Sequence, residues 1–100
     1  MLVRRRAVLS PAATRQLNAL KARERAILIA SIRESLERAN ALEQSRNRFR
    51  LRRPSEHAEF ELRVGNLRVF YRVAGIRVEI VLIGRKVRDA LIVEGRRFVL

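Results

Sequence analysis

The spacing of apolar residues predicts that the chain opens with a strand and two helices. Residues 1–9 read as a strand with basic residues at its centre. Ser10-Pro11 then provides a helix start, because serine can cap a helix whose first position is proline. Apolar residues at i, i+4 and i+7 give this helix one buried face and end it near residue 21. A longer stripe of apolar residues over 23–43 predicts a second helix, and the two are expected to form a helical hairpin.

The hydrophobic period changes to two in the second half of the chain, which predicts strands. Residues 46–53 alternate loosely around Phe49 and Leu51 and precede a proline, so a strand is expected there. From Glu59 the alternation is strict, and Gly65-Asn66 is a favourable two-residue turn between two antiparallel strands.

The remaining residues predict a third strand and a short terminal hairpin. Ala74-Gly75 can turn the chain again, and alternation continues the strand until Gly84. Residues 85–90 read as a polar connection. The apolar runs at 91–93 and 98–100, separated by a Glu-Gly pair, then favour a hairpin or a strand and tail.

This order of elements predicts an α+β fold: an N-terminal strand, a helical hairpin, then an antiparallel β-sheet meander. One hundred residues suit a single domain spanning 1–100, and no repeat or linker interrupts the chain. A layer of helices on an antiparallel sheet leaves one face of the sheet open.

The charge of the chain predicts an anionic partner. There are 23 Lys and Arg against 10 Asp and Glu, a formal net charge of +13 that is spread over both halves. Arginine far outnumbers lysine, and its planar fork suits phosphate and carboxylate groups. The chain has no cysteine, so no metal site or cofactor is expected. Neither a secretory signal nor a membrane-length apolar run is found, so we expect a cytoplasmic protein.

A two-residue turn at Gly65-Asn66 places Arg63 opposite Arg68 on the outer face of the sheet. Like charges in that position repel unless a carboxylate or an anion lies between them. If Ala74-Gly75 is an equally tight turn, Arg72 opposes Arg77 on the same face, with Phe70 between the two pairs. Arginine pairs suit a phosphodiester and an aromatic ring suits an unpaired base, so this face is a candidate surface for single-stranded RNA. The alternative is an ordinary solvated face, neutralised by its glutamates (Glu59, Glu61, Glu79).

Lys86 lies near the end of the third strand, flanked by Arg85 and Arg88. A lysine among cations can serve as a general base, while the plainer alternative is a solvated loop lysine. His57 is expected to be an exposed loop residue. Tyr71 falls on the apolar side of its strand, where a core tyrosine with a bonded hydroxyl is expected.

Two segments resemble the toxins of the RelE/ParE superfamily. They are ELRVGNLRVFYRV at 61–73 and, after a short hydrophobic strand, IGRK at 83–86. The Ser-Pro start of the first helix agrees, and the order of elements matches over the whole chain. The resemblance implies the toxin of a bacterial type II toxin–antitoxin system, bound by a cognate antitoxin that covers its basic face.

The superfamily has two main activities, and the resemblance leaves both open. RelE-like toxins enter the ribosome and cut mRNA without a metal, by attack of a ribose 2′-hydroxyl on the adjacent phosphate. ParE-like toxins inhibit DNA gyrase without catalysis. The charge also permits a third function, a non-toxic nucleic-acid-binding module.

Carried over to this chain, the nuclease pattern implies catalytic roles for two residues. Arg68 matches an arginine that contacts phosphate and stabilises the transition state, and Lys86 matches a basic position that handles phosphate charge or proton transfer. The other predicted RNA contacts are Arg63, Phe70, Arg72, Arg85 and Arg88. The chain departs from the pattern at Leu91-Ile92-Val93, where many of the nucleases place a tyrosine or histidine; Asp89 or a water is the substitute acid.

Overall fold

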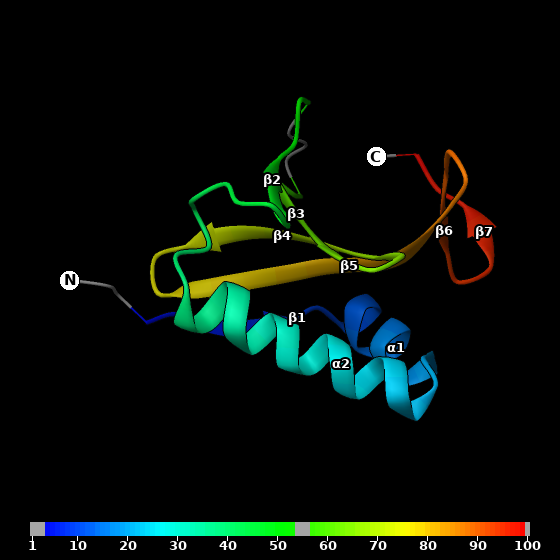
Figure 1. Ribbon diagram of the computed structural model, residues 1–100, viewed down its shortest axis with the longest axis horizontal. Coiled ribbons are helices and arrows are strands. Elements are labelled where there is room, and N and C mark those ends of the chain that lie inside the picture. Colours follow the sequence, from blue (N-terminus) through cyan, green and yellow to red (C-terminus); the bar gives the residue numbers. More distant parts are fainter. Residues whose placement is uncertain (1–3, 54–56, 100) are drawn as a thin grey trace.

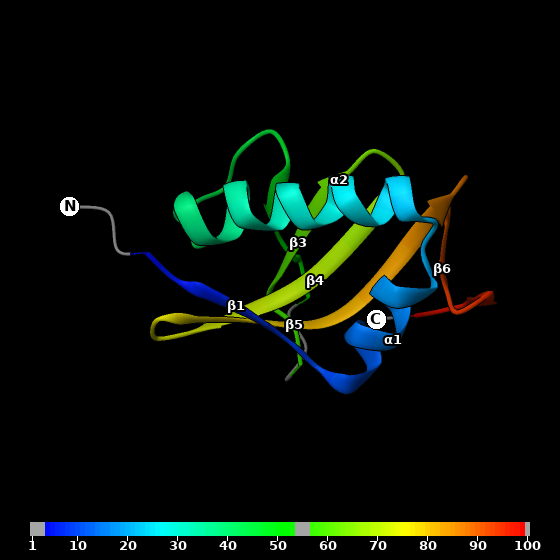
Figure 2. The ribbon, with the colours of Figure 1, turned by 90° about the horizontal axis from the view of Figure 1, so that it is seen from below.

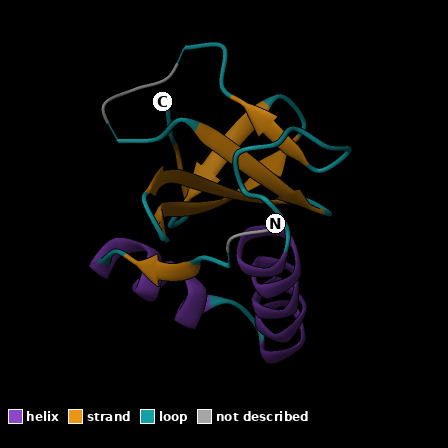
Figure 3. Cartoon of the chain, turned by 90° about the vertical axis from the view of Figure 1, so that its left-hand side faces the viewer, coloured by secondary structure: helices purple, strands orange, loops and turns teal. Residues whose placement is uncertain are grey.

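A computed structural model describes residues 4–53 and 57–99 and gives the α+β architecture that the hydrophobic pattern predicts. Figure 1 shows the helices below a curved sheet, and Figure 3 shows the same two layers from the side. The predicted fold class is therefore confirmed.

The first strand and the first helix begin as expected. β1 (Arg6–Leu9) leads directly into α1 (Pro11–Ala19). The Oγ atom of Ser10 accepts a hydrogen bond from the Ala13 backbone N–H at 3.0 Å and donates one to the Val81 carbonyl at 3.0 Å. The cap therefore stabilises the helix start and also ties it to the sheet.

The second helix is shorter than the apolar stripe predicts. α2 (Ala22–Ile32) continues as one π-helical segment, η1 (Arg33–Arg38), and runs along the sheet in Figure 2. The helix ends at Ala39, whose N–H bonds back to the Glu34 carbonyl, so the predicted extension to residue 43 is wrong. The wide turn of a π-helix lets Ser35 and Leu36 both be buried.

The described residues contain one sheet with the strand order β2-β3-β4-β5-β6-β7. Its strands, besides β1, are β2 (Arg48–Arg50), β3 (Phe60–Val64), β4 (Leu67–Ala74), β5 (Arg77–Val87), β6 (Ala90–Val93) and β7 (Arg96–Arg97). β1 pairs in parallel with the first part of β5, and β6 pairs with its last part. The long β5 strand is therefore shared by two neighbours along one edge.

The strand predicted over 46–53 is limited to β2. The outward N–H groups of Arg48 and Arg50 are bonded by side chains of the preceding loop, from Ser45 and Gln44 respectively. These contacts close the outer edge of the sheet to further strand pairing. Pro54, which marks the predicted end of the strand, lies outside the described residues.

Two strand boundaries differ from the prediction. Ala74 pairs with Arg77, so the second turn is Gly75-Ile76, and Ile76 is two-thirds exposed rather than inward. Strand β5 also continues through Val87, so residues 85–87 belong to a strand and only Arg88-Asp89 form the connection.

A bulge at Val81 reverses the alternation of side chains along β5 and turns Ile83 inward in place of Leu82. A terminal hairpin forms from β6 and β7, but its second strand is Arg96–Arg97 and not the apolar run predicted from residue 98 onward.

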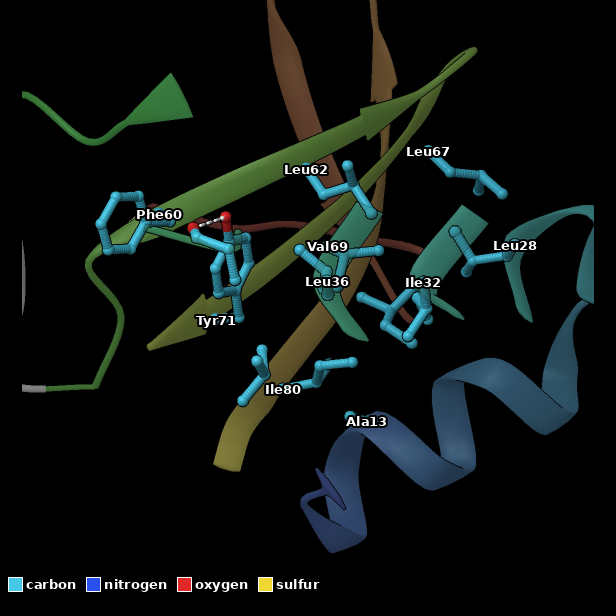
Figure 4. Packing of buried hydrophobic residues seen from close by; sticks show 13 residues of the cluster. Ala13, Leu28, Ile32, Leu36, Phe60, Leu62, Leu67, Val69, Tyr71 and Ile80 are labelled. Atoms are coloured by element: carbon cyan, nitrogen blue, oxygen red, sulfur yellow. Dashed lines mark hydrogen bonds between the residues drawn. The ribbon is translucent and has the colours of Figure 1, made fainter. Parts of the chain in front are cut away.

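The core lies between the helices and one face of the sheet. Figure 4 shows Leu28, Ile32 and Leu36 of the long helix packed toward the strands. Tyr71 is fully buried, stacks on Phe60 at 5.3 Å between ring centroids, and donates its hydroxyl to the Ala41 carbonyl at 2.8 Å. Full burial and the bonded hydroxyl confirm Tyr71 as a core residue, and burial also raises the pKa of this hydroxyl.

Candidate functional site: a cationic cavity on the open face of the sheet

The open face is the side of the sheet away from the helices. β2 and β3 on one side, and β6 and β7 on the other, rise above it in Figure 1. Between them lies a cavity of about 410 Å³, which we call the cation cavity. It is lined by Leu51, Glu61, Arg63, Arg68, Phe70, Lys86, Asp89, Leu91, Phe98 and Val99.

The hairpin register brings the predicted site residues to this cavity. Arg63 pairs with Arg68 across the Gly65-Asn66 turn, as the sequence predicts. Arg68 in turn lies opposite Gly84 on β5, two residues before Lys86. The backbone N–H of Lys86 donates to the Asn66 carbonyl at 2.7 Å, which fixes the end of β5 against the turn.

Arg68 is held in place by the backbone of its own hairpin. Its Nη1 atom donates to the carbonyls of Gly65 and Leu67, at 2.8 and 3.0 Å. No carboxylate of the described residues pairs with it. Partial burial, followed by the charge of Arg63, lowers the pKa of Arg68 below its ordinary value. An anion in the cavity would relieve this unfavourable environment of the guanidinium.

Arg63 is neutralised in part by its neighbour. Its Nη2 and Nε atoms donate to one oxygen of Glu61, at 2.7 and 3.0 Å, and its Cζ lies 4.0 Å from the centre of the Phe49 ring. Glu61 therefore pairs directly with Arg63, and it acts on Arg68 only through its charge, without a salt bridge.

The remaining cavity residues offer a cation, a carboxylate and an apolar wall. The side chain of Lys86 is exposed, and Asp89 lines the same cavity from the turn after β5. Phe70 also lines the cavity but is only 3% exposed, so most of its ring is covered. Extensive base stacking on Phe70 would need its covering residues to move.

Three other predicted RNA contacts lie away from the cavity or at its margin. Arg72 pairs with Glu79 instead of Arg77, because the second turn is one residue later than predicted, and their Nε–Oε1 distance is 2.6 Å. Arg85 points to the helices, where both of its terminal nitrogens bind Glu24 at 2.8 Å. Arg88 is exposed in the turn between β5 and β6 and does not line the cavity.

Sequence reasoning missed the apolar walls of the site. Leu51 follows β2, Leu91 belongs to β6, and Phe98 and Val99 form the chain end beyond β7. Gly84 is the sequence signal that could have revealed the wall formed by β6. A Cβ there would lie 2.9 Å from the Ile92 carbonyl and from side-chain atoms of Leu91 and Val93, so only glycine lets β6 approach so closely.

The fold and the cavity together define a class of protein. It is a small basic α+β domain whose cavity contains an arginine, Arg68, that has no paired carboxylate among the described residues. The family model described as the ParE toxin of the type II toxin–antitoxin system, parDE, matches residues 7–90. The chain belongs to this family of toxins.

Comparison with solved structures supports the same superfamily of toxins, RelE/ParE. The chain is similar to a chain of the RelBE2 toxin–antitoxin complex from Mycobacterium tuberculosis, with a TM-score of 0.69 and 26% sequence identity. The match covers 84% of this chain and 100% of that one. A search of curated protein sequences gave no match. No helix in the described part of the chain is long and apolar enough to span a membrane.

Proposed function

We propose that this toxin, when released from its antitoxin, binds mRNA on the ribosome and cleaves it. The observation that carries the proposal is the convergence of Arg63, Arg68 and Lys86, from three adjacent strands, on one cavity. Cations held at fixed positions in a partly enclosed site stabilise a phosphate whose negative charge increases in the transition state.

The cleavage step needs a base, a phosphate-stabilising group and an acid. A ribose 2′-oxygen forms a bond to phosphorus, the bond to the 5′-oxygen breaks, and a 2′,3′-cyclic phosphate results. In this proposal Lys86 accepts the 2′ proton as a neutral amine and becomes an ammonium, while Arg68 contacts the phosphate through its Nε and Nη2 atoms. Asp89 as a protonated carboxyl group, or a water beside it, supplies the proton to the leaving 5′-oxygen. Arg63 provides additional positive charge.

Controlled expression with pulse labelling tests this function. Translation and DNA synthesis are followed separately over the first minutes, and specific messengers are examined for cuts. We expect translation to fall promptly, with messenger cleavage, and the effect to be lost in Arg68→Ala and Lys86→Ala. Intact toxicity in both variants would exclude the proposed mechanism.

Inhibition of DNA gyrase is the second candidate, and it is favoured by the match to the ParE toxin model and by one feature of the cavity. The segment that would carry a tyrosine or histidine acid is Leu91-Ile92-Val93, and no such side chain lines the cavity within the described residues. A binding toxin needs no proton donor. In the same labelling experiment, a fall in DNA synthesis with intact messengers would support this function. The absence of any growth effect would indicate a non-toxic nucleic-acid-binding module.

We also propose that the chain is bound by a cognate antitoxin. The structural relative was solved as a toxin–antitoxin complex, and the formal charge of +13 favours an acidic partner. Co-expression with the protein encoded beside the toxin gene is expected to restore growth and to give a complex that survives purification.

A further inference from the structure

A second hollow on the open face is apolar and lies outside the cation cavity. We call this hollow of about 630 Å³ the apolar groove. It runs between the start of α1, the middle of β5 and the chain end, and is lined by Ser10, Pro11, Ala12, Arg15, His57, Val81, Leu82, Phe98 and Val99. Val99 is 93% exposed and Phe98 is 41% exposed, so the groove leaves apolar surface in contact with water.

Cations gather at one end of the groove. A smaller hollow of about 250 Å³ shares Ser10, His57 and Val81 with it and extends to Arg72 and Glu79. Arg77 pairs with Arg6 across β1 and β5, and its Nη2 atom lies 3.1 Å from Glu79. Two arginines, Arg72 and Arg77, therefore share a single carboxylate, and Arg6 is the register neighbour of Arg77. We call these three residues the arginine cluster (Arg6, Arg72, Arg77).

We propose that the apolar groove and the arginine cluster together form the docking site of an acidic amphipathic segment of the antitoxin. Its aliphatic side chains would fill the groove over Val81, Leu82 and Val99, and its carboxylates would meet the arginine cluster. This inference rests on the proposed antitoxin partnership and adds the location of the contact. The function proposed for the cation cavity does not itself require an apolar hollow at this place.

Charge and shape favour this occupant over others. A second copy of the chain would bring its own net charge of +13 and a second arginine cluster against the first, which repels. The groove is mainly aliphatic, and among the described residues its aromatic rings are those of Phe98 and His57, so it offers little surface for stacking RNA bases.

The position of the groove links the docking site to the toxin's active surface. Phe98 and Val99 line both the apolar groove and the cation cavity. A segment seated in the groove would therefore contact Phe98 and Val99, which also form part of the wall of the cavity that contains Arg68 and Lys86.

The test measures antitoxin binding to purified toxin variants by titration calorimetry. Ala12→Asp places a carboxylate in the groove, and an acidic residue in the first turn of a helix is compatible with folding. Arg77→Glu reverses one charge of the cluster. The matched control is Ile27→Asp, which puts the same acid on an exposed apolar position of α2. We expect about tenfold or greater loss of affinity in Ala12→Asp and Arg77→Glu, and none in Ile27→Asp. We also expect Ala12→Asp to remain toxic when expressed alone.

Other outcomes would overturn the inference. Wild-type affinity in both groove variants, with a stable wild-type complex, would refute this docking site while leaving the antitoxin partnership intact. A wild-type toxin that binds no antitoxin would refute both. If light scattering shows a toxin dimer that Ala12→Asp converts to a monomer, a second copy occupies the groove instead.

Discussion

The two ends of the open face carry the same kinds of residue but differ in how their charges are satisfied. At one end Arg63 opposes Arg68, and Arg68 has no carboxylate partner among the described residues. At the other end Arg72 and Arg77 both bind Glu79, with nearest N–O distances of 2.6 and 3.1 Å. The first end leaves Arg68 without a paired carboxylate, while the second shares one carboxylate between two arginines and so keeps a net positive charge.

A shift of one residue in a turn creates this difference. The turn at Gly65-Asn66 places Arg63 and Arg68 opposite each other, whereas the turn at Gly75-Ile76 moves Arg72 from Arg77 to Glu79. Because side chains alternate between the faces of a strand, register decides which charges meet. Two similar hairpins can therefore produce one arginine without a paired carboxylate and another that pairs with Glu79.

The largest effect that separates the two ends is expected on toxicity. If messenger cleavage is the activity, Arg68→Ala lowers the cleavage rate about 100-fold or more, because a fixed transition-state donor is lost. Arg72→Ala, at the other end of the face, is expected to leave cleavage unchanged. Cleavage of a defined messenger on purified ribosomes measures both, and equal losses would show that the whole face binds RNA.

Two glycines provide the next comparison, with stability as the readout. Gly84→Ala forces a Cβ against the Ile92 carbonyl at 2.9 Å and is expected to cost about 1–3 kcal/mol in the free energy of unfolding. Gly75→Ala meets no atom within 4 Å and costs only about 1 kcal/mol for its φ of +61°. Urea denaturation compares them. A Gly84 variant no less stable than the Gly75 variant would mean that β6 can move aside easily.

A smaller effect is expected from removing one carboxylate at each end. Glu61→Gln releases Arg63 and is expected to tighten binding of a short single-stranded RNA about two- to fivefold. Glu79→Gln lies outside the cation cavity and is expected to change this affinity little. Fluorescence anisotropy at low salt measures both variants. Equal tightening would indicate that only net charge, and not the cavity, controls RNA binding.

The smallest effect concerns the one predicted RNA contact that faces the helices. The hydrogen bonds from Arg85 hold the pKa of Glu24 below its ordinary value of 4.5. A carboxyl group with a lowered pKa stabilises the fold above its unfolded pKa, and the contribution disappears as the pH falls through the folded value. Glu24→Gln is therefore expected to lower the urea midpoint slightly at about pH 6.5 and by less at about pH 3. A difference of the same size in acid would mean that the ion pair is not its cause.

Much of the cation cavity could be predicted from the sequence, and the predictions that failed have identifiable causes. The Gly65-Asn66 turn fixed a local register, so the pairing of Arg63 with Arg68 followed directly. The predicted pairing of Arg72 with Arg77 was wrong because Ala74-Gly75 and Gly75-Ile76 are both acceptable turns, and the local pattern does not choose between them. The direction of Arg85 depended on β5 continuing past Gly84 and on a carboxylate of a distant helix.

The sequence by itself determined the elements, the single apolar core, the positive charge and the first hairpin register, because these depend on neighbours close in the chain. Only the tertiary structure decided which faces meet. It added β1 to the same edge of β5 as β6, covered Phe70, and brought the chain end beside both the cation cavity and the apolar groove. Such contacts join residues far apart in sequence, and their energies depend on packing that no local pattern records.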